Sequence, residues 1–184
     1  VINFIQILGS VLDLGVPSDS TVSLAKLTAT GTKNSTTFLR GDNTFAEAGG
    51  GKVLQVITST RSTNITTTST SFVTTNFSLA ITPSTTASKI LLMANTTAQI
   101  TGSDINLDIY RSTSSSFVSG GKSRGLIGME PANVMMSVPI IHLDSPSTTS
   151  AITYTIYFRN NGGQTSSFLR SDVLSSFTAI EIGA

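Results

Sequence analysis

Alternation of apolar and polar side chains limits the possible folds of this chain more than any other feature. In the run 152–159, the residues Ile, Tyr, Ile and Phe alternate with Thr, Thr, Tyr and Arg. The run from Ile105 to Tyr110 alternates in the same way. A period of two is typical of a β-strand that packs one face and leaves the other in water or in an interface. We therefore expect half-buried strands at both places.

Runs of β-branched and aromatic residues recur along most of the chain after residue 51. They predict strands at 52–60, 70–83, 88–100, 105–112, 133–144, 151–160 and 175–183. Turns rich in Ser, Thr, Gly and Pro separate these runs. This succession predicts an all-β fold whose C-terminal part is an antiparallel, jelly-roll-like β-sandwich. The strand pattern alone does not distinguish a jelly roll from other sandwich topologies.

The composition supports an ordered all-β chain. Ser and Thr make up 57 of the 184 residues, whereas only 11% of the residues are charged and 39% are hydrophobic. A disordered chain normally carries more charge and fewer apolar residues. Thr, Val and Ile are β-branched, and they suit the pleated, half-buried surface of a sheet.

The first fifty residues differ in character from the rest. Residues 15–50 are rich in turn formers such as Pro17 and Gly31 and have too few apolar side chains to build a core. We predict an N-terminal stalk or attachment arm with a Gly-rich linker at 1–50, and a β-sandwich head domain at 51–184. An ordered arm must bury its apolar side chains against something else, and another copy of the chain is the simplest candidate.

Charge and residue usage exclude several classes of partner. The net charge is +1 and no cluster of Lys or Arg occurs, so attraction to nucleic acid or to an anionic membrane is not supported. The chain has no cysteine, which excludes disulfides and thiolate metal sites. No apolar run approaches the ~18 residues of a membrane span. We expect neither a nucleic-acid partner nor membrane insertion.

Two short motifs invite a functional interpretation. Arg40-Gly41-Asp42 is the tripeptide that animal integrins recognise, but three-residue matches are common and Gly-Asp-Asn is ordinary turn chemistry. The glycine run 49–51 is followed by Lys52 and then by valine, so it lacks the Ser or Thr with which a phosphate loop holds magnesium. A nearer match at 116–123 begins with serine instead of glycine. We interpret 49–51 as a flexible joint and 120–125 as loop.

No residue pattern predicts catalysis or metal binding. His142 is the only histidine, and a half-exposed strand position is its simplest interpretation because metal sites need a cluster of ligands. Asp104 and Asp108 fall on one face of a strand about 13 Å apart, at ~3.3 Å per residue, which is too far for a paired-carboxylate site. We therefore predict no catalytic residues, no metal site and no cofactor, and we do not expect an enzyme.

The stretch 113–134 is the longest part of the head without a strand pattern. It holds four glycines and reads as a long loop, or as a loop with one short strand. Long loops on a rigid sandwich are where binding residues concentrate. We therefore look for a binding site here first.

Residues 23–57 resemble the linker of tail-fibre and related appendage proteins of tailed bacteriophages, especially marine ones. Such linkers run as Leu-x-Ala-x-Gly-Thr, a few polar residues, Thr-Phe-Leu-Arg-Gly-Asp-x-Thr-Trp/Phe and a Gly-rich tail. The matching residues are Leu27, Ala29, Gly31, Thr32, Thr37, Phe38, Leu39, Arg40, Gly41, Asp42, Thr44 and Phe45. The resemblance places Arg40-Gly41-Asp42 in a fibre linker. The residues after the linker are similar, more loosely, to the small Ser/Thr-rich β domains that end such fibres.

The resemblance implies a homotrimer in the virion, with intertwined arms that also meet other virion proteins. The trimer contacts that it suggests are Ile5, Ile7, Leu8, Val22, Leu24, Leu27, Phe38, Leu39 and Phe45. A trimeric fibre head would bind a host cell-surface receptor, expected to be a glycan such as a polysaccharide. Phe117, Lys122 and Arg124 in the long loop are the candidate receptor-binding residues. The alternative is a capsid-decorating or head fibre, or an adaptor, with no receptor-binding role.

Overall fold

The computed structural model describes residues 28–47, 52–100, 102–130 and 134–183. The chain divides into two compact units, residues 1–50 and 51–184, and each is described by itself. Within the described residues, no helix is long and apolar enough to cross a membrane.

The smaller unit contains an antiparallel hairpin of β1 (Thr37–Leu39) and β2 (Phe45–Glu47). The Arg-Gly-Asp tripeptide lies in its turn, where the Arg40 N–H donates to the Thr44 carbonyl at 2.8 Å. Asp42 accepts hydrogen bonds from both the hydroxyl (2.6 Å) and the N–H (3.1 Å) of Thr44. These bonds hold the pKa of Asp42 below its usual value, and the bond from the Thr44 hydroxyl has the larger effect. The tripeptide is therefore used as turn chemistry.

One sheet of the larger unit is built around β6 (Lys89–Gln99). β6 pairs on one side with β10 (Met135–Asp144) and on the other with β13 (Ser175–Ile182), which pairs in turn with β3 (Val53–Arg61). The short strands β12 (Ser166–Phe168) and β4 (Ile65–Thr67) continue β13 and β3 beyond a break, and β12 pairs with the far end of β6.

The second sheet is built around β11 (Ile152–Asn160). β11 pairs with β5 (Val73–Ile81) on one side and with β7 (Ile105–Arg111) on the other. The short strands β8 (Ser116–Phe117) and β9 (Ile127–Met129) pair in succession along the free edge of β7. A short 3-10 helix, η2 (Ser112–Ser114), connects β7 to β8.

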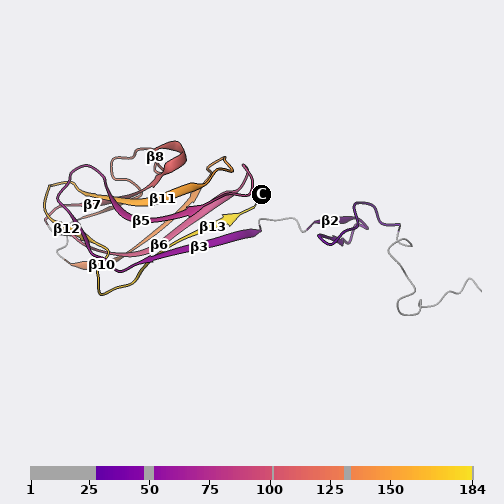
Figure 1. Ribbon diagram of the computed structural model, residues 1–184, viewed down its shortest axis with the longest axis horizontal. Coiled ribbons are helices and arrows are strands. Elements are labelled where there is room, and N and C mark those ends of the chain that lie inside the picture. The colour runs from indigo at the N-terminus through magenta and orange to yellow at the C-terminus, as the bar shows by residue number, and fades with distance from the viewer. Residues whose placement is uncertain (1–27, 48–51, 101, 131–133, 184) are drawn as a thin grey trace, which may run out of the picture. The chain divides into compact units, whose positions relative to one another are not determined.

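The two antiparallel sheets form the two layers of a sandwich, with β5, β7 and β11 in one layer and β3, β6, β10 and β13 in the other (Figure 1). We count β3/β4, β8/β9 and β12/β13 each as one interrupted strand. The orders β10–β6–β13–β3 and β8–β7–β11–β5 are then those of an eight-stranded jelly roll. The predicted antiparallel β-sandwich is confirmed, and the strand order selects the topology that the strand pattern left open.

Alternation places the core as predicted. The even-numbered residues of β11 from Ile152 to Phe158 are fully buried, and so are Ile90 and Leu92 of β6. They meet the inward side chains of the opposite sheet in one hydrophobic cluster. Because a slip of one residue would turn each strand inside out, this cluster fixes the register of both sheets.

A buried carboxylate ties the loop between β5 and β6 to the first sheet. Glu181 on β13 has no exposed surface, and its oxygens accept hydrogen bonds from Gln55 Nε2 (2.5 Å), the Ser84 N–H (2.6 Å) and Ser88 Oγ (2.7 Å). Burial works to raise the pKa of Glu181, but the hydrogen bonds from Gln55, Ser88 and Ser84 together hold it below its usual value. A buried charge is tolerated here because its oxygens have donors.

A second buried cluster joins the two sheets. Arg111 of β7 donates to both carboxylate oxygens of Asp144 of β10, at 2.8 and 3.0 Å. The hydroxyl of the buried Tyr154 donates to the same carboxylate at 2.6 Å. Burial and then the bond to Asp144 raise the pKa of Tyr154, so the phenol stays protonated as a donor.

We predict that Glu181→Gln destabilises the protein by about 2–3 kcal/mol. The new side-chain amide nitrogen is itself a donor, and it would replace a carboxylate oxygen that now accepts hydrogen bonds. Urea unfolding at pH 7 measures this loss. The matched control is Glu130→Gln, which changes a side chain that is 70% exposed and should leave the unfolding midpoint almost unchanged. Equal effects of the two substitutions would contradict the role given to Glu181.

The same carboxylate predicts an acid-dependent loss of stability. A pKa that is lowered on folding contributes stability above the usual value of 4.5, and that contribution is lost as the pH falls through the folded-state pKa. Between pH 6 and pH 3, the wild-type protein should therefore lose more stability than Glu181→Gln. Parallel stability curves for the two proteins over this range would refute this assignment.

Candidate functional site

The candidate site is the segment 112–130, which leaves β7 through η2 and returns along the edge of the same strand. β8 pairs Phe117 with Tyr110, and β9 pairs Met129 with Ile105. Between them, the exposed residues 120–124 project from the edge, while the amides of Val118 and Leu126 donate to β7 carbonyls at 2.9 Å. The predicted loop thus contains two short strands instead of at most one.

Glycines allow the projection to turn back to the sheet. Gly120, Gly121 and Gly125 all have positive φ, which L side chains rarely adopt. A Cβ on Gly125 would also collide with the Leu107 carbonyl oxygen and lie 3.0 Å from Cβ of Asp108. Gly120 has open space around it. Gly125 is therefore the point at which the segment presses most closely on β7.

Phe117 anchors the segment through aromatic contacts. Its ring centroid lies 5.0 Å from that of Phe72, 5.6 Å from that of Tyr110 and 5.4 Å from that of Tyr157. We call these four half-buried rings the aromatic cluster; they lie on the outer face of the second sheet. Within the described part of the chain, the hydroxyls of Tyr110 and Tyr157 have no hydrogen-bond partner. Tyrosines of this kind offer a ring face and a polar tip to a ligand.

The alternation in β7 places Asn106 and Asp108 on its outer face, which the sequence left either in water or in an interface. Both residues are fully buried, because the segment 112–130 covers them. Asp108 accepts hydrogen bonds from Ser119 Oγ (2.5 Å) and from the Ile109 N–H (2.8 Å). Burial nevertheless raises the pKa of Asp108.

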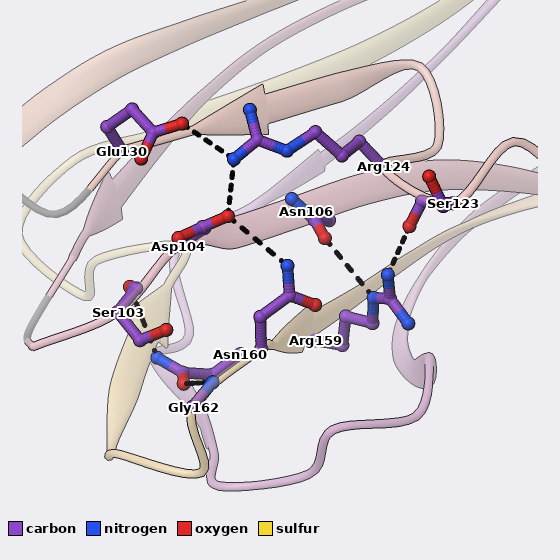
Figure 2. Close-up of polar contacts among 10 residues, drawn as sticks. Ser103, Asp104, Asn106, Ser123, Arg124, Glu130, Arg159, Asn160 and Gly162 are labelled. Carbon is purple, nitrogen blue, oxygen red and sulfur yellow. Dashed lines mark hydrogen bonds and ion pairs between the residues drawn. The ribbon is translucent and has the colours of Figure 1, made fainter.

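Arg124 is held by two carboxylates. One terminal nitrogen of its guanidinium lies 2.5 Å from Asp104 and 2.6 Å from Glu130, as Figure 2 shows. Asn161 Nδ2 also donates to Asp104, at 3.2 Å. The bond from Arg124, followed by that from Asn161, lowers the pKa of Asp104, and the two carboxylates raise the pKa of Arg124. Arg124 therefore fixes the loop against the end of β7, with 49% of its side chain still exposed.

A second arginine secures the segment from the neighbouring strand. Arg159 of β11 donates from Nε to Asn106 Oδ1 at 3.2 Å and from Nη2 to the carbonyl of Ser123 (Figure 2). Its guanidinium carbon lies 4.9 Å from the ring centroid of Phe72, a favourable cation–π position. The buried Asn106 Nδ2 has no hydrogen-bond partner within the described residues.

The three candidate receptor-binding residues thus lie in one segment but differ in their surroundings. Phe117 packs into the aromatic cluster, Arg124 is engaged by Asp104 and Glu130, and Lys122 is exposed on the projection. Tyr110 and Tyr157 were not among the residues predicted to bind a ligand. Their outward parity in two neighbouring strands is the signal that could have identified them.

The remaining candidates have separate outcomes. His142 is a partly exposed residue of β10, as predicted. No group of three or more acidic or histidine side chains in the described segments could hold a metal ion.

The predicted trimer contacts fall in the other unit. Phe38 (49%) and Leu39 (46%) are exposed, whereas Phe45 is half-buried, with Lys33 Nζ 5.6 Å from its ring centroid. The following lie outside the described residues: Ile5, Ile7, Leu8, Val22, Leu24, Leu27 and the glycine run 49–51. The hairpin therefore leaves two of its three predicted contacts open to a partner.

Comparisons with known proteins place the chain only loosely. No protein-family model matches it, and no curated protein matches it. Among the solved structures that match is a chain from the structure of infectious bursal disease virus Gx strain, with 10% identity and a TM-score of 0.35. The match covers 75% of this chain and 41% of that chain, so this chain spans less than half of the viral chain's length.

We predict that Gly125→Ala releases the segment 112–130 from β7, whereas Gly120→Ala does not. Both variants incur the cost of positive φ, about 1–2 kcal/mol, and only Gly125→Ala adds a collision, for about 2–4 kcal/mol in all. Hydrogen exchange at the amides of Val118 and Leu126, which bond to β7, should accelerate only in Gly125→Ala. Equal exchange rates in both variants would contradict this account of the segment.

Proposed function

We propose that this chain is a virion structural protein, a homotrimeric bacteriophage fibre whose jelly-roll head binds a polysaccharide on the host surface. The N-terminal arm would join the copies and attach them to other virion proteins, so the protein would lie at the particle surface. The observation that carries the receptor role is the aromatic cluster beside the projecting loop with Lys122. Jelly rolls form both viral capsid domains and lectin domains, although a fold alone does not determine function.

The hairpin supports the fibre interpretation of the linker. The motif residues that resemble phage fibre linkers include the turn in which Asp42 accepts two hydrogen bonds from Thr44. The motif residues therefore have a structural role, because they form the hairpin and its turn. Exposed Phe38 and Leu39 on the same hairpin offer apolar surface that sister copies would cover.

The aromatic cluster has the chemistry of a glycan platform. Ring faces pack against the apolar faces of sugars, and the two tyrosine hydroxyls and Lys122 would bond to sugar hydroxyls or carboxylates. Such contacts are individually weak, so three heads on one fibre would multiply them by raising the effective concentration. The rigid β7–β11 pair beneath the cluster keeps the rings in place without a ligand.

A capsid-decorating or head fibre, or an adaptor without a receptor, is the second candidate. It is favoured by the fact that Phe117 packs into the aromatic cluster and Arg124 is engaged by Asp104 and Glu130, which leaves less of either side chain for a ligand. For this function, the chain would be recovered with particles yet bind no surface polysaccharide.

We predict that Lys122→Glu and Tyr157→Phe each weaken binding of the full-length protein to its polysaccharide. The expected loss for one hydrogen bond is roughly fivefold to tenfold. Biolayer interferometry against a panel of purified bacterial surface polysaccharides would first find the ligand and then rank the variants.

The matched control for Lys122→Glu is Lys52→Glu, which makes the same charge change at an exposed position before β3 and should leave the affinity unchanged. Retained binding by both site variants would exclude the aromatic cluster as the platform. Failure of the wild-type chain to bind any polysaccharide would favour the adaptor instead.

A further inference from the structure

The outer face of the first sheet carries exposed apolar side chains in rows that cross all its long strands. The strand registers define one row as Leu143, Leu91, Ile180 and Val56, and the next as Ile141, Met93, Thr178 and Thr58. Ile141 is 68% exposed, Val56 57%, Leu143 48% and Met93 40%. We call this surface the apolar face. Scattered single hydrophobic residues need no explanation, but contiguous rows of them mark an interaction surface.

The apolar face is almost without charge. Among the outward positions of β3, β6, β10 and β13, Lys89 at one end is the only ionisable side chain. The buried Glu181 points inward, and Arg61 of β3 donates to the Thr75 carbonyl of the opposite sheet. A partner selected by charge would therefore find nothing to recognise, whereas another uncharged apolar face would fit.

The face is large enough for a stable interface. Its four strands lie about 4.8 Å apart, and each is some nine residues long at ~3.3 Å per residue. As a flat surface they cover roughly 600 Å². This figure covers the whole outer face, including polar positions such as Asn95 and Ser176. It approaches the ~800 Å² that each partner contributes to a standard interface.

The same face supplies a knob and a hollow. A depression of about 340 Å³ is lined by Met93, Asn95, Pro139, Ile141, Ser176 and Thr178. Ile141 lies at the rim of this depression and is more exposed than Val56, Leu143 or Met93. In a threefold assembly each interface joins different parts of two copies, so Ile141 of one copy can enter the hollow of the next.

The edge of the sheet argues for packing through the face. Among the strands that the structure describes, β10 pairs with β6 alone, and it carries Pro139 near its middle. Proline lacks the N–H that strand addition would need, and it is a common means of blocking an edge. Copies that meet here would therefore pack face to face rather than extend the sheet.

We infer that a second copy of this chain covers the apolar face, so that the head domains have an interface of their own in addition to the N-terminal arm. The inference rests on the proposed function, which brings copies together in a fibre. The area, the lack of charge and the paired knob and hollow all select a copy as the occupant. The aromatic cluster lies on the other sheet and remains free for a ligand.

Cysteine labelling of the full-length protein tests this inference, because the chain has no native cysteine. Ile141→Cys reports on the face, and Leu174→Cys is a matched control because Ile141 is 68% and Leu174 67% exposed within one chain. If a copy covers the face, maleimide should label Cys at 141 at least tenfold more slowly than Cys at 174. Thr178→Cys, in the hollow, is a second reporter should Ile141→Cys fail to fold.

Light scattering of the same samples separates the possible failures. Equal labelling rates in an assembly with a multiple of 19.2 kDa would overturn the inference and leave the oligomeric fibre standing. A mass of one chain would overturn both proposals. Slow labelling at the mass of one chain would mean that the chain covers its own face, and this would also overturn the inference.

Discussion

Burial of one face of each sheet against the other is the constraint on which every other feature of the head domain depends. β6 and β11 are interior strands, and their inward side chains, such as Leu92 and Ile156, are fully buried. The carboxylates of this interior have partners, as Glu181 has in its serine and glutamine donors and Asp144 has in Arg111. Because the core supplies the stability, the outer faces are free to differ in chemistry.

The sequence predicts the long strands well because each of them alternates against a single core. It does not predict β4 and β12, because segments of three residues are too short to show an alternating pattern. These two strands form where β12 pairs with the end of β6. The burial of the outer face of β7 could not be predicted for a related reason. Alternation reports which side of a strand faces the core, and it cannot report that the segment 112–130 returns to cover Asn106 and Asp108.

The candidate site shows the same division between local and long-range information. Phe117, Lys122 and Arg124 could be chosen from the loop because binding residues gather on loops. Their surroundings could not be predicted, since Phe72 precedes β5 while Tyr110 and Tyr157 lie on β7 and β11, and the three rings meet only after the sheet is paired. The two outer faces thus suggest a division of labour, with an apolar face for sister copies and an aromatic face beside a projecting loop for a ligand.

A cryo-EM map of the assembled full-length protein tests this division of labour most directly. The account predicts several jelly rolls that meet through the outer faces of β3, β6, β10 and β13, with Tyr110, Tyr157 and Lys122 open to solvent. A map in which the heads touch through the aromatic cluster, or in which isolated heads leave Ile141 and Val56 in water, would contradict it.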